Sequence, residues 1–334
     1  MKKLINDPND VARETIEGLA LAYPQYLRQL PGLPVVARKD APVAGQVAVL
    51  TGGGSGHEPM FAGFVGRGMA HGSVAGNVFA SPPPAPVEAA ARAIHGGAGV
   101  LFLYGNYSGD ILNFDMAAED LDTEGIVVRT VRITDDVASA PAGREDERRG
   151  IAGDFFVIKC AGARAEEGAT LDEVTAAAEE ANANTRTMAI ALSSCTIPAS
   201  GRPIFEISDQ DMEIGMGLHG EPGIRRGAMM RADEVAAQLV GGILEDMPAL
   251  RGADVAVLVN GMGATPLAEL LIVFRSVHRL LTDAGITIVR TYTGNFATSL
   301  EMAGCSVTLL RLTPMLRRLL LAPADSPACV QAGA

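Results

Sequence analysis

The sequence alternates short apolar runs with glycine-rich segments and helix-length stretches, and this alternation constrains the fold more than any other feature. Its 38 glycines lie at the ends of the apolar runs, where a strand-to-helix turn needs a positive φ or a close backbone approach. The expected strands are residues 47–50, 99–104, 126–131, 188–192, 255–259, 286–289 and 307–310. The expected helices are residues 84–94, 112–122, 171–183, 231–244 and 266–284. This order predicts an α/β fold with largely parallel sheets.

The length of 334 residues predicts two domains of about 150 residues each. Residues 141–149, PAGREDERR, are the strongest run of charged and turn-forming residues, and we interpret them as a surface connection. Residues 150–184 are expected to form a pair of helices, after which strand 188–192 begins a second sheet. We therefore expect an N-terminal α/β domain, residues 1–184, and a C-terminal α/β domain, residues 185–334.

The composition argues against several classes of function. Asp and Glu total 39 against 27 Lys and Arg, and the net charge of -12 would repel nucleic acid and anionic lipid. No apolar run reaches the ~18 residues of a membrane span, and the first ten residues lack a signal-peptide core. The sequence therefore predicts a soluble, cytoplasmic protein without a nucleic-acid or membrane partner. Its widely spaced cysteines argue against a zinc or redox motif and favour buried thiols at Cys160, Cys195, Cys305 and Cys329.

The first candidate motif is TGGGSGHEP, residues 51–59, which follows the expected strand 47–50. Open α/β sheets bind ligands at the carboxyl ends of their strands. A glycine-rich loop here would let backbone N–H groups approach a small polar ligand, with His57 beside it. The segment lacks the lysine of a Walker A loop, and His57 replaces the third glycine of a dinucleotide fingerprint. The alternative is a structural turn with a hydrogen-bonded histidine.

The second motif is GNYSGD, residues 105–110, which follows the strand that ends at Tyr104. Asp110 would open the next helix, so it is either the N-cap of that helix or a functional carboxylate. Two strand ends would then present His57 and Asp110 on one rim, and these groups form a usable acid–base pair.

The third motif is MGLHGEPG, residues 216–223, in which glycines flank His219. An imidazole with so little shielding can act as a nucleophile, while the alternative is a hydrogen-bonded histidine in a turn. His71, His95 and His278 lack such a setting and are expected to be structural. Cys195 has no obvious base beside it, and we interpret it as a packing residue.

Six motifs in this order resemble the substrate-binding subunit of the dihydroxyacetone kinases: GGGSGHEP, GNYSGD, RRGIAG, ALSSCTIP, MGLHGEPG and NGMGATPLAEL. The resemblance runs from roughly residue 1 to residue 321. It implies the two-domain α/β fold of that K subunit, which is usually a homodimer. It also implies capture of a short-chain ketose through a covalent hemiaminal with a histidine.

The resemblance assigns the hemiaminal to His219, whose imidazole must be neutral to attack the ketone carbon. It assigns the base for the terminal hydroxyl to Asp110, with His57 sharing that role. Phosphoryl transfer then needs mainly in-line positioning and neutralisation of charge by Mg²⁺ and cationic groups. Contacts to the substrate oxygens would come from the backbone of Gly54, Ser55 and Gly56.

The sequence departs from the family at Gly105, where many members carry a lysine that reaches a substrate oxygen. A cationic donor is therefore missing, and about a side chain's volume is freed. Either another group or water fills this gap, or the pocket takes a larger ketose. A four-carbon ketose such as erythrulose is therefore the alternative substrate, because a smaller residue would help to admit it.

Single-chain kinases of this family continue into a helical nucleotide-binding domain, whereas this chain ends at Ala334. The resemblance thus implies no metal or cofactor on this chain. Mg²⁺ with ATP, or ADP recharged by a sugar-phosphotransferase relay, would be carried by a separate helical subunit. One alternative is a ketose sensor that acts on a transcriptional regulator, and another is a binding domain without covalent chemistry. The joint presence of His57, Asp110 and His219 favours the kinase.

Overall fold

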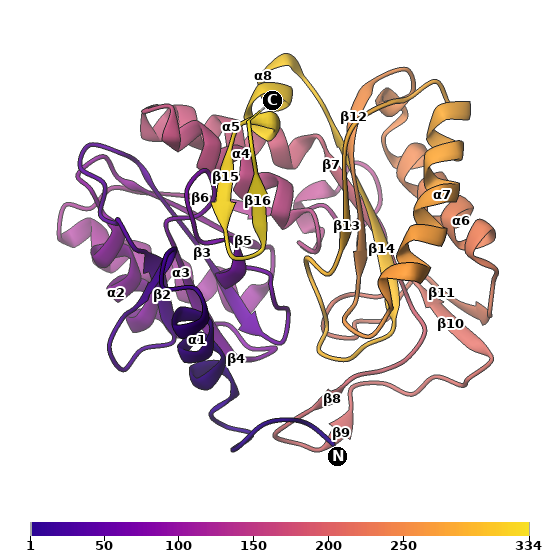
Figure 1. Ribbon diagram of the computed structural model, residues 1–334, viewed down its shortest axis with the longest axis horizontal. Coiled ribbons are helices and arrows are strands. Elements are labelled where there is room, and N and C mark those ends of the chain that lie inside the picture. The colour runs from indigo at the N-terminus through magenta and orange to yellow at the C-terminus, as the bar shows by residue number, and fades with distance from the viewer. Residues whose placement is uncertain (1, 334) are drawn as a thin grey trace. The chain divides into compact units, whose positions relative to one another are not determined.

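The computed structural model describes residues 2–333, which form two compact units (Figure 1). The N-terminal unit comprises residues 2–133, 154–181 and 314–333, and the C-terminal unit comprises residues 134–153 and 182–313. A single boundary after residue 184 does not describe this division. Residues 134–153 lie with the later strands because Asp136 bridges to Thr187, and residues 314–333 return to the first unit. The unit to which residues 134–153 and 314–333 belong is set by packing between segments that are distant in the sequence. The order of the elements along the chain does not reveal this packing.

The sheet of the N-terminal unit has the strand order β1-β2-β4-β3-β5-β6. Strands β4, β3, β5 and β6 pair in parallel, and β2 and β1 extend the sheet with antiparallel pairing. The strands are β1 (Leu27–Gln29), β2 (Val35–Arg38), β3 (Ala48–Ser55), β4 (Gly72–Val78), β5 (Val100–Gly105) and β6 (Val128–Ile133). Parallel neighbours need crossover connections, which α2 (Pro84–Ile94) and α3 (Ser108–Thr123) provide.

Helix α2 illustrates how the sequence determines these elements. Pro83 has an extended conformation, with φ -66 and ψ 160, and the helix begins at the next residue, because proline tolerates the first helical turn but not the interior. Its apolar side chains recur with helical spacing and pack with α3 against β3, β4 and β5. Helix α4 (Asp154–Glu166) is buried along most of its length and contacts β3 and β5 outside that cluster.

The sheet of the C-terminal unit has the order β11-β10-β7-β14-β12-β13. Its strands are β7 (Thr185–Ala191), β10 (Asp211–Ile214), β11 (Arg225–Ala228), β12 (Asp254–Gly261), β13 (Thr287–Gly294) and β14 (Gly304–Arg311). Within the described residues only β12 and β13 pair in parallel, through the crossover helix α7 (Leu267–Asp283). The other pairs are antiparallel, so the prediction of parallel pairing does not extend to this sheet. The expectation rested on helices alternating with strands, whereas in the described part of the chain no helix lies between β7 and β10 or between β13 and β14.

Helices α6 (Ala232–Asp246) and α7 lie side by side in the C-terminal unit (Figure 1). Their apolar faces share one core with β7, β12 and β14, in which Leu239, Val257, Val277 and Val307 are buried. The predicted α/β class is confirmed in both units.

The C-terminal segment braces the part of the chain that follows His57. Strands β15 (Ala324–Ser326) and β16 (Cys329–Gln331) form an antiparallel hairpin. The backbone N–H of Ala328 donates to Gly63 O at 3.0 Å, and Arg67 N–H donates to Asp325 O at 3.0 Å. Before the hairpin, α8 (Pro314–Leu321) packs on α4, where Lys159 Nζ donates to Leu319 O at 2.8 Å.

Most predicted elements are present with shifted ends. The helices predicted at 84–94 and 171–183 coincide with α2 and α5 (Leu171–Ala183), while β3 and β13 run several residues past their predicted ends. The sequence analysis did not anticipate α1 (Val11–Ala22), β1, β2, β4, β10, β11 and the short pairs β8 (Thr196–Ile197), β9 (Arg202–Pro203), β15 and β16. No helix in residues 2–333 combines the length and the apolar character that a membrane crossing needs.

Candidate functional site

The glycine-rich motif is a strand rather than the expected loop. Strand β3 continues through Ser55, and the turn begins at Gly56, where φ is +98. The glycines allow close packing instead. A Cβ on Gly53 would lie 2.5 Å from the Phe61 ring, and one on Gly54 would lie 2.9 Å from Phe79 Cα. These contacts bring Phe61 and Phe79 against the bare backbone of the glycines, so Gly53 and Gly54 are packed within the fold rather than in an open loop.

His57 lies directly after this strand and is only 2% exposed. Its ring stacks on Phe79, with 5.0 Å between centroids and 20° between planes. Ser55 Oγ donates to Gly76 O at 2.7 Å, and the Gly56 N–H donates to the Glu58 carboxylate, 3.0 Å from Oε2. Of the backbone groups predicted to contact substrate, the Gly56 N–H therefore has a protein partner in this structure.

Asp110 is not the N-cap of its helix. Helix α3 begins at Ser108 after Tyr107, so Asp110 lies within the first turn, where the helix dipole favours a carboxylate. The residue is 9% exposed. Burial raises the pKa of the neighbouring Tyr104 phenol to about 12, and the negative charges nearby, Asp110 among them, add to that rise.

His57 and Asp110 follow adjacent parallel strands and therefore lie at the same edge of the sheet, since β3 pairs with β5 with Thr51 opposite Leu103. The segment after β4 connects the two loops. Phe79 stacks on His57, and a Cβ on Gly109 would lie 3.3 Å from Ser81 Cβ. Gly105 ends β5 and is buried opposite Ile133 of β6. The predicted rim of the N-terminal unit is thus formed from these residues.

His219 belongs to the C-terminal unit and lies in the loop between β10 and β11. Its side chain is 25% exposed, so the ring is not turned into the interior. A side-chain hydrogen bond stabilises the loop backbone next to His219, because Ser299 Oγ donates to Leu218 O at 2.6 Å. Asn260 organises the segment that carries Ser299, accepting the N–H of Ala297 at 2.9 Å and donating to Ala297 O at 2.8 Å. The NGMG motif therefore supports the His219 loop.

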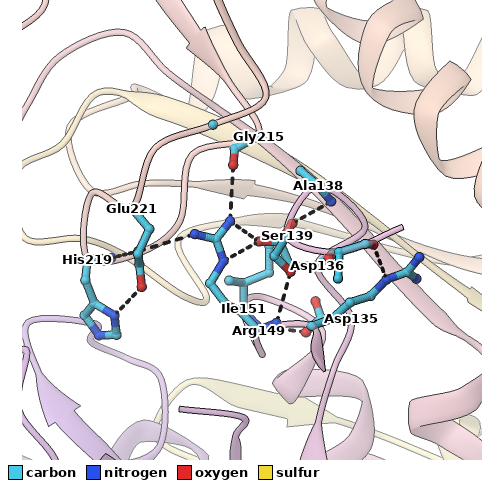
Figure 2. Close-up of polar contacts among 12 residues, drawn as sticks. Asp135, Asp136, Ala138, Ser139, Arg149, Ile151, Gly215, His219 and Glu221 are labelled. Carbon is cyan, nitrogen blue, oxygen red and sulfur yellow. Dashed lines mark hydrogen bonds and ion pairs between the residues drawn. The ribbon is translucent and has the colours of Figure 1, made fainter. Parts of the chain in front are cut away.

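A chain of polar contacts leads from His219 into the unit (Figure 2). His219 Nδ1 lies 3.0 Å from Glu221 Oε1, and the His219 backbone N–H donates to Glu221 Oε2 at 2.9 Å. Arg149 Nη1 lies 3.8 Å from Glu221 Oε2. Burial favours the neutral acid, but the hydrogen bond and charge of His219, with Arg149, outweigh it and lower the pKa of Glu221 to about 2. Glu221 is therefore a carboxylate at neutral pH.

Arg149 also makes hydrogen bonds to residues other than Glu221. It donates to Asp136 Oδ2 from Nη2 at 2.7 Å and from Nε at 3.0 Å, and to Gly215 O at 3.3 Å. Burial raises the pKa of Asp136 to about 7, opposed by Arg149 and reinforced by Asp135. A Cβ on Gly217 would overlap Glu221 Oε2 and lie 2.6 Å from Arg149 Nη1, so glycine there makes room for this contact.

Glu221 lies in the MGLHGEPG motif and Arg149 in RRGIAG, but neither was predicted to have a functional role. The available signal was a carboxylate two positions after the candidate nucleophile. The predicted surface connection 141–149 also needs correction, because its last residues are structural. Arg148 is 0% exposed and donates to Asp246 at 2.9 Å. The composition indicated a solvated run of charges, but this arginine is buried and paired with a carboxylate.

Among the remaining histidines, His71 has the structural setting that the sequence predicts. His71 is buried, and its Nδ1 accepts the N–H of Val49 at 3.1 Å. His95 follows α2 as its C-cap, and His278 is exposed on α7. The cysteines at 160, 195, 305 and 329 are free and buried, which confirms the predicted buried thiols. Burial raises the pKa values of Cys160 and Cys305 to about 12, so neither is a reactive thiolate.

Two curated proteins show how far the similarity extends. The D-erythrulose kinase of Mycolicibacterium smegmatis is 47% identical over 328 residues, which cover 98% of this chain and 56% of that protein. The dihydroxyacetone-binding subunit DhaK of the PTS-dependent dihydroxyacetone kinase 2 of Listeria innocua is 43% identical over 328 residues, 98% of either chain. This chain thus spans about half of the first relative and nearly all of the second.

Two solved structures share the fold over nearly the whole chain. The dihydroxyacetone kinase from C. freundii in complex with AMP-PNP and Mg²⁺ has a TM-score of 0.91 at 33% identity, covering 99% of this chain and 61% of that chain. The dihydroxyacetone kinase operon co-activator Dha-DhaQ has a TM-score of 0.89 at 31% identity, covering 95% and 98%. The resemblance drawn from the six motifs is confirmed. Because the Dak1 domain matches residues 17–328, the chain belongs to the Dak1 domain family.

Proposed function

We propose that this chain is the substrate-binding subunit of a dihydroxyacetone-type ketose kinase. In this proposal His219 holds a short-chain ketose as a hemiaminal, and Asp110 accepts the proton of its terminal hydroxyl with His57 sharing the role. The observation that carries the proposal is the partly exposed His219 ring with Nδ1 3.0 Å from a carboxylate, in a member of the Dak1 domain family. Relatives named as dihydroxyacetone-binding subunits, which match this chain end to end, support it.

Covalent capture gives the proposed site its selectivity. A ketose offers a carbonyl carbon that an imidazole can attack, whereas a polyol such as glycerol has none and cannot gain the bond. The same bond orients the substrate, so its terminal hydroxyl is presented in a restricted position for the next step.

Asp110 suits a general base because its carboxylate lies in the first turn of α3, where the helix dipole favours the ionised form. Its location at the sheet edge that also carries His57 supports a shared proton-transfer role. A positioned general base contributes about 10²- to 10⁴-fold to a rate. Gly54, Ser55 and Gly56 would supply substrate contacts once Gly56 N–H exchanges Glu58 for a substrate oxygen.

The phosphoryl donor in this proposal is carried by a separate helical nucleotide subunit, as ATP or as ADP recharged from phosphoenolpyruvate. No group of three or more His, Cys, Asp or Glu side chains in residues 2–333 has the arrangement of a metal site. In this proposal Mg²⁺ arrives with the nucleotide, as the family resemblance implies. A cytoplasmic homodimer is part of the same proposal, following the family resemblance.

The test combines this chain with a helical nucleotide subunit from its own genome, Mg²⁺ and either donor system. Dihydroxyacetone labelled with ¹³C at the carbonyl reports capture, because its signal moves from the ketone to the saturated-carbon region of the spectrum. We expect Asp110→Asn to keep this adduct while phosphorylation falls about 10²- to 10⁴-fold. Asp120→Asn, a change to an exposed residue of the same helix, should leave both unchanged. Absence of an adduct in the wild-type complex, with every ketose tried, would sink the proposal.

A tetrulose is the second candidate substrate. The D-erythrulose kinase is 47% identical to this chain, and Gly105 ends β5 where many family members carry lysine. We expect Gly105→Lys to restore a cationic donor and reduce the space, so the ratio of kcat/KM for erythrulose over dihydroxyacetone should fall about tenfold, or ~1.4 kcal/mol. An unchanged ratio in the folded variant would show that Gly105 does not set substrate size.

A ketose-binding co-activator is the second candidate function, because the co-activator structure shares this fold at 31% identity. It predicts the same adduct on His219 but no phosphorylated product with either donor. The reconstituted assay therefore separates the two functions directly.

A further inference from the structure

The carboxylate of Glu221 contacts His219 twice, once at the ring and once at the backbone. Oε1 lies 3.0 Å from Nδ1, and Oε2 accepts the His219 N–H at 2.9 Å. An ionised carboxylate only accepts hydrogen bonds, so Nδ1 must carry the ring proton to satisfy this contact. The nitrogen with the lone pair is then Nε2.

The second oxygen of Glu221 is fixed by more than the backbone. Arg149 Nη1 lies 3.8 Å from Oε2, and Arg149 is anchored to buried Asp136 at 2.7 Å. Gly217 leaves the space in which the carboxylate and the guanidinium meet. The low pKa of Glu221, about 2, agrees with a carboxylate that stays charged throughout the physiological range.

We propose that Glu221 is the positioning residue of the hemiaminal chemistry. Its carboxylate holds the proton on His219 Nδ1, which makes Nε2 the attacking atom, and balances the positive charge that the ring gains on attack. The inference rests on the proposed function, because it assumes that His219 captures a ketose. Arg149 acts one contact further out and keeps Oε2 directed to the backbone N–H.

The step balances as follows. The Nε2 lone pair forms a bond to the ketone carbon, and the π pair of the carbonyl moves to its oxygen. That oxygen takes a proton from solvent and becomes a hydroxyl. The Nδ1 proton stays in its bond to Glu221, so the adduct is an imidazolium paired with a carboxylate.

Glu221→Gln gives a sharp test because an amide has one acceptor and two donors. The backbone N–H of His219 and the Arg149 guanidinium both require an oxygen at the Oε2 position. The NH₂ group must then face Nδ1, which forces Nδ1 to accept and moves the ring proton to Nε2. Glu221→Ala only removes the partner and leaves a mixture of tautomers.

The experiment records ¹⁵N spectra of histidine-labelled full-length protein, with the His219 signals assigned by their loss in His219→Gln. We expect the proton on Nδ1 in the wild type, on Nε2 in Glu221→Gln, and on both in Glu221→Ala. Affinity for ¹³C-labelled dihydroxyacetone should fall about 100-fold in Glu221→Gln and about tenfold in Glu221→Ala. The more conservative variant, Glu221→Gln, should thus lose more affinity than Glu221→Ala. A purely structural role for Glu221 predicts the reverse order. Glu245→Gln, at an exposed position of α6, is the matched control and should change neither readout.

Two results would overturn the inference while the proposed function stands. One is a wild-type adduct with the ring proton on Nε2, and the other is an adduct of undiminished affinity in folded Glu221→Gln. Loss of the adduct from the wild type itself would instead refute the proposed function. Arg149→Met provides a second variant if either Glu221 substitution does not fold, and its affinity should fall about threefold to tenfold.

Discussion

His71 in the N-terminal unit and His219 in the C-terminal unit carry the same imidazole in opposite hydrogen-bond arrangements. At His71 the Nδ1 atom accepts the backbone N–H of Val49 at 3.1 Å, so the ring proton lies on Nε2, 3.2 Å from Gln46 Oε1. At His219 the Nδ1 atom faces a carboxylate, which leaves the proton on Nδ1. His71 is 1% exposed and His219 a quarter exposed.

The comparison teaches that the partner of Nδ1, together with exposure, decides what a histidine can do. A backbone N–H uses up the Nδ1 lone pair, and burial and the Arg38 charge lower the pKa of His71 to about 3. That ring is a neutral structural bridge. A carboxylate instead directs the lone pair to Nε2 and can balance a positive ring, which suits a nucleophile.

The largest expected effect distinguishes the two rings by chemistry. His219→Gln should abolish the ketose adduct, because no imidazole remains to attack the carbonyl. His71→Gln should retain the adduct in whatever fraction of the protein is folded. Carbonyl-labelled dihydroxyacetone and ¹³C NMR provide the measurement, with circular dichroism as the control for folding. An adduct in His219→Gln, or its disappearance from folded His71→Gln, would reverse the assignment of roles.

The next effect concerns stability and belongs to His71. Below pH 6.5 the unfolded chain protonates this ring, while the folded protein resists protonation until about pH 3. The contribution of His71 to the free energy of unfolding is therefore fully present above pH 6.5 and is lost as the pH falls towards 3. Between pH 6.5 and 4 the wild type should lose about 3 kcal/mol of unfolding free energy that His71→Gln does not lose. Urea denaturation at a series of pH values measures it, and parallel curves for the two proteins would contradict the prediction.

The smallest effect is the corresponding pH dependence of Glu221. Its pKa is lowered to about 2 in the folded protein, so its stabilisation is present above the usual pKa of a glutamate and is lost as the pH falls below it. Because the side chain is 30% exposed, solvent screening reduces the contribution. The stability gap between wild type and Glu221→Gln should narrow by about 1 kcal/mol between pH 5 and 3. A gap that stays constant would show that the carboxylate is not held ionised by its partners.

The sequence predicts those elements whose ends and buried faces are marked by neighbouring residues. Helix α2 is predicted to the residue because Pro84 marks its start and its apolar spacing is regular. The candidate residues His57, Asp110 and His219 were found through strand-end motifs, and the roles proposed for them await the experiments above. Local patterns also predicted the buried thiols and the structural His71.

What sequence reasoning missed depends on contacts between distant residues. Nothing local distinguishes a glycine that forms a loop from Gly53, whose bare Cα admits the Phe61 ring. Arg148 looks solvated within a charged run, yet it pairs with Asp246, 98 residues away. The antiparallel neighbours of β7 are likewise set by which distant strands fill its two edges.

Gly217 limits how the His219 loop can diverge. Even an alanine there would displace the Glu221 carboxylate and the Arg149 guanidinium from their present contacts. In a library that randomises the loop and selects for ketose capture, we expect position 217 to return the parental residue alone while exposed neighbours vary. Engineers who wish to widen the substrate range should leave this position untouched and diversify exposed positions of the loop instead.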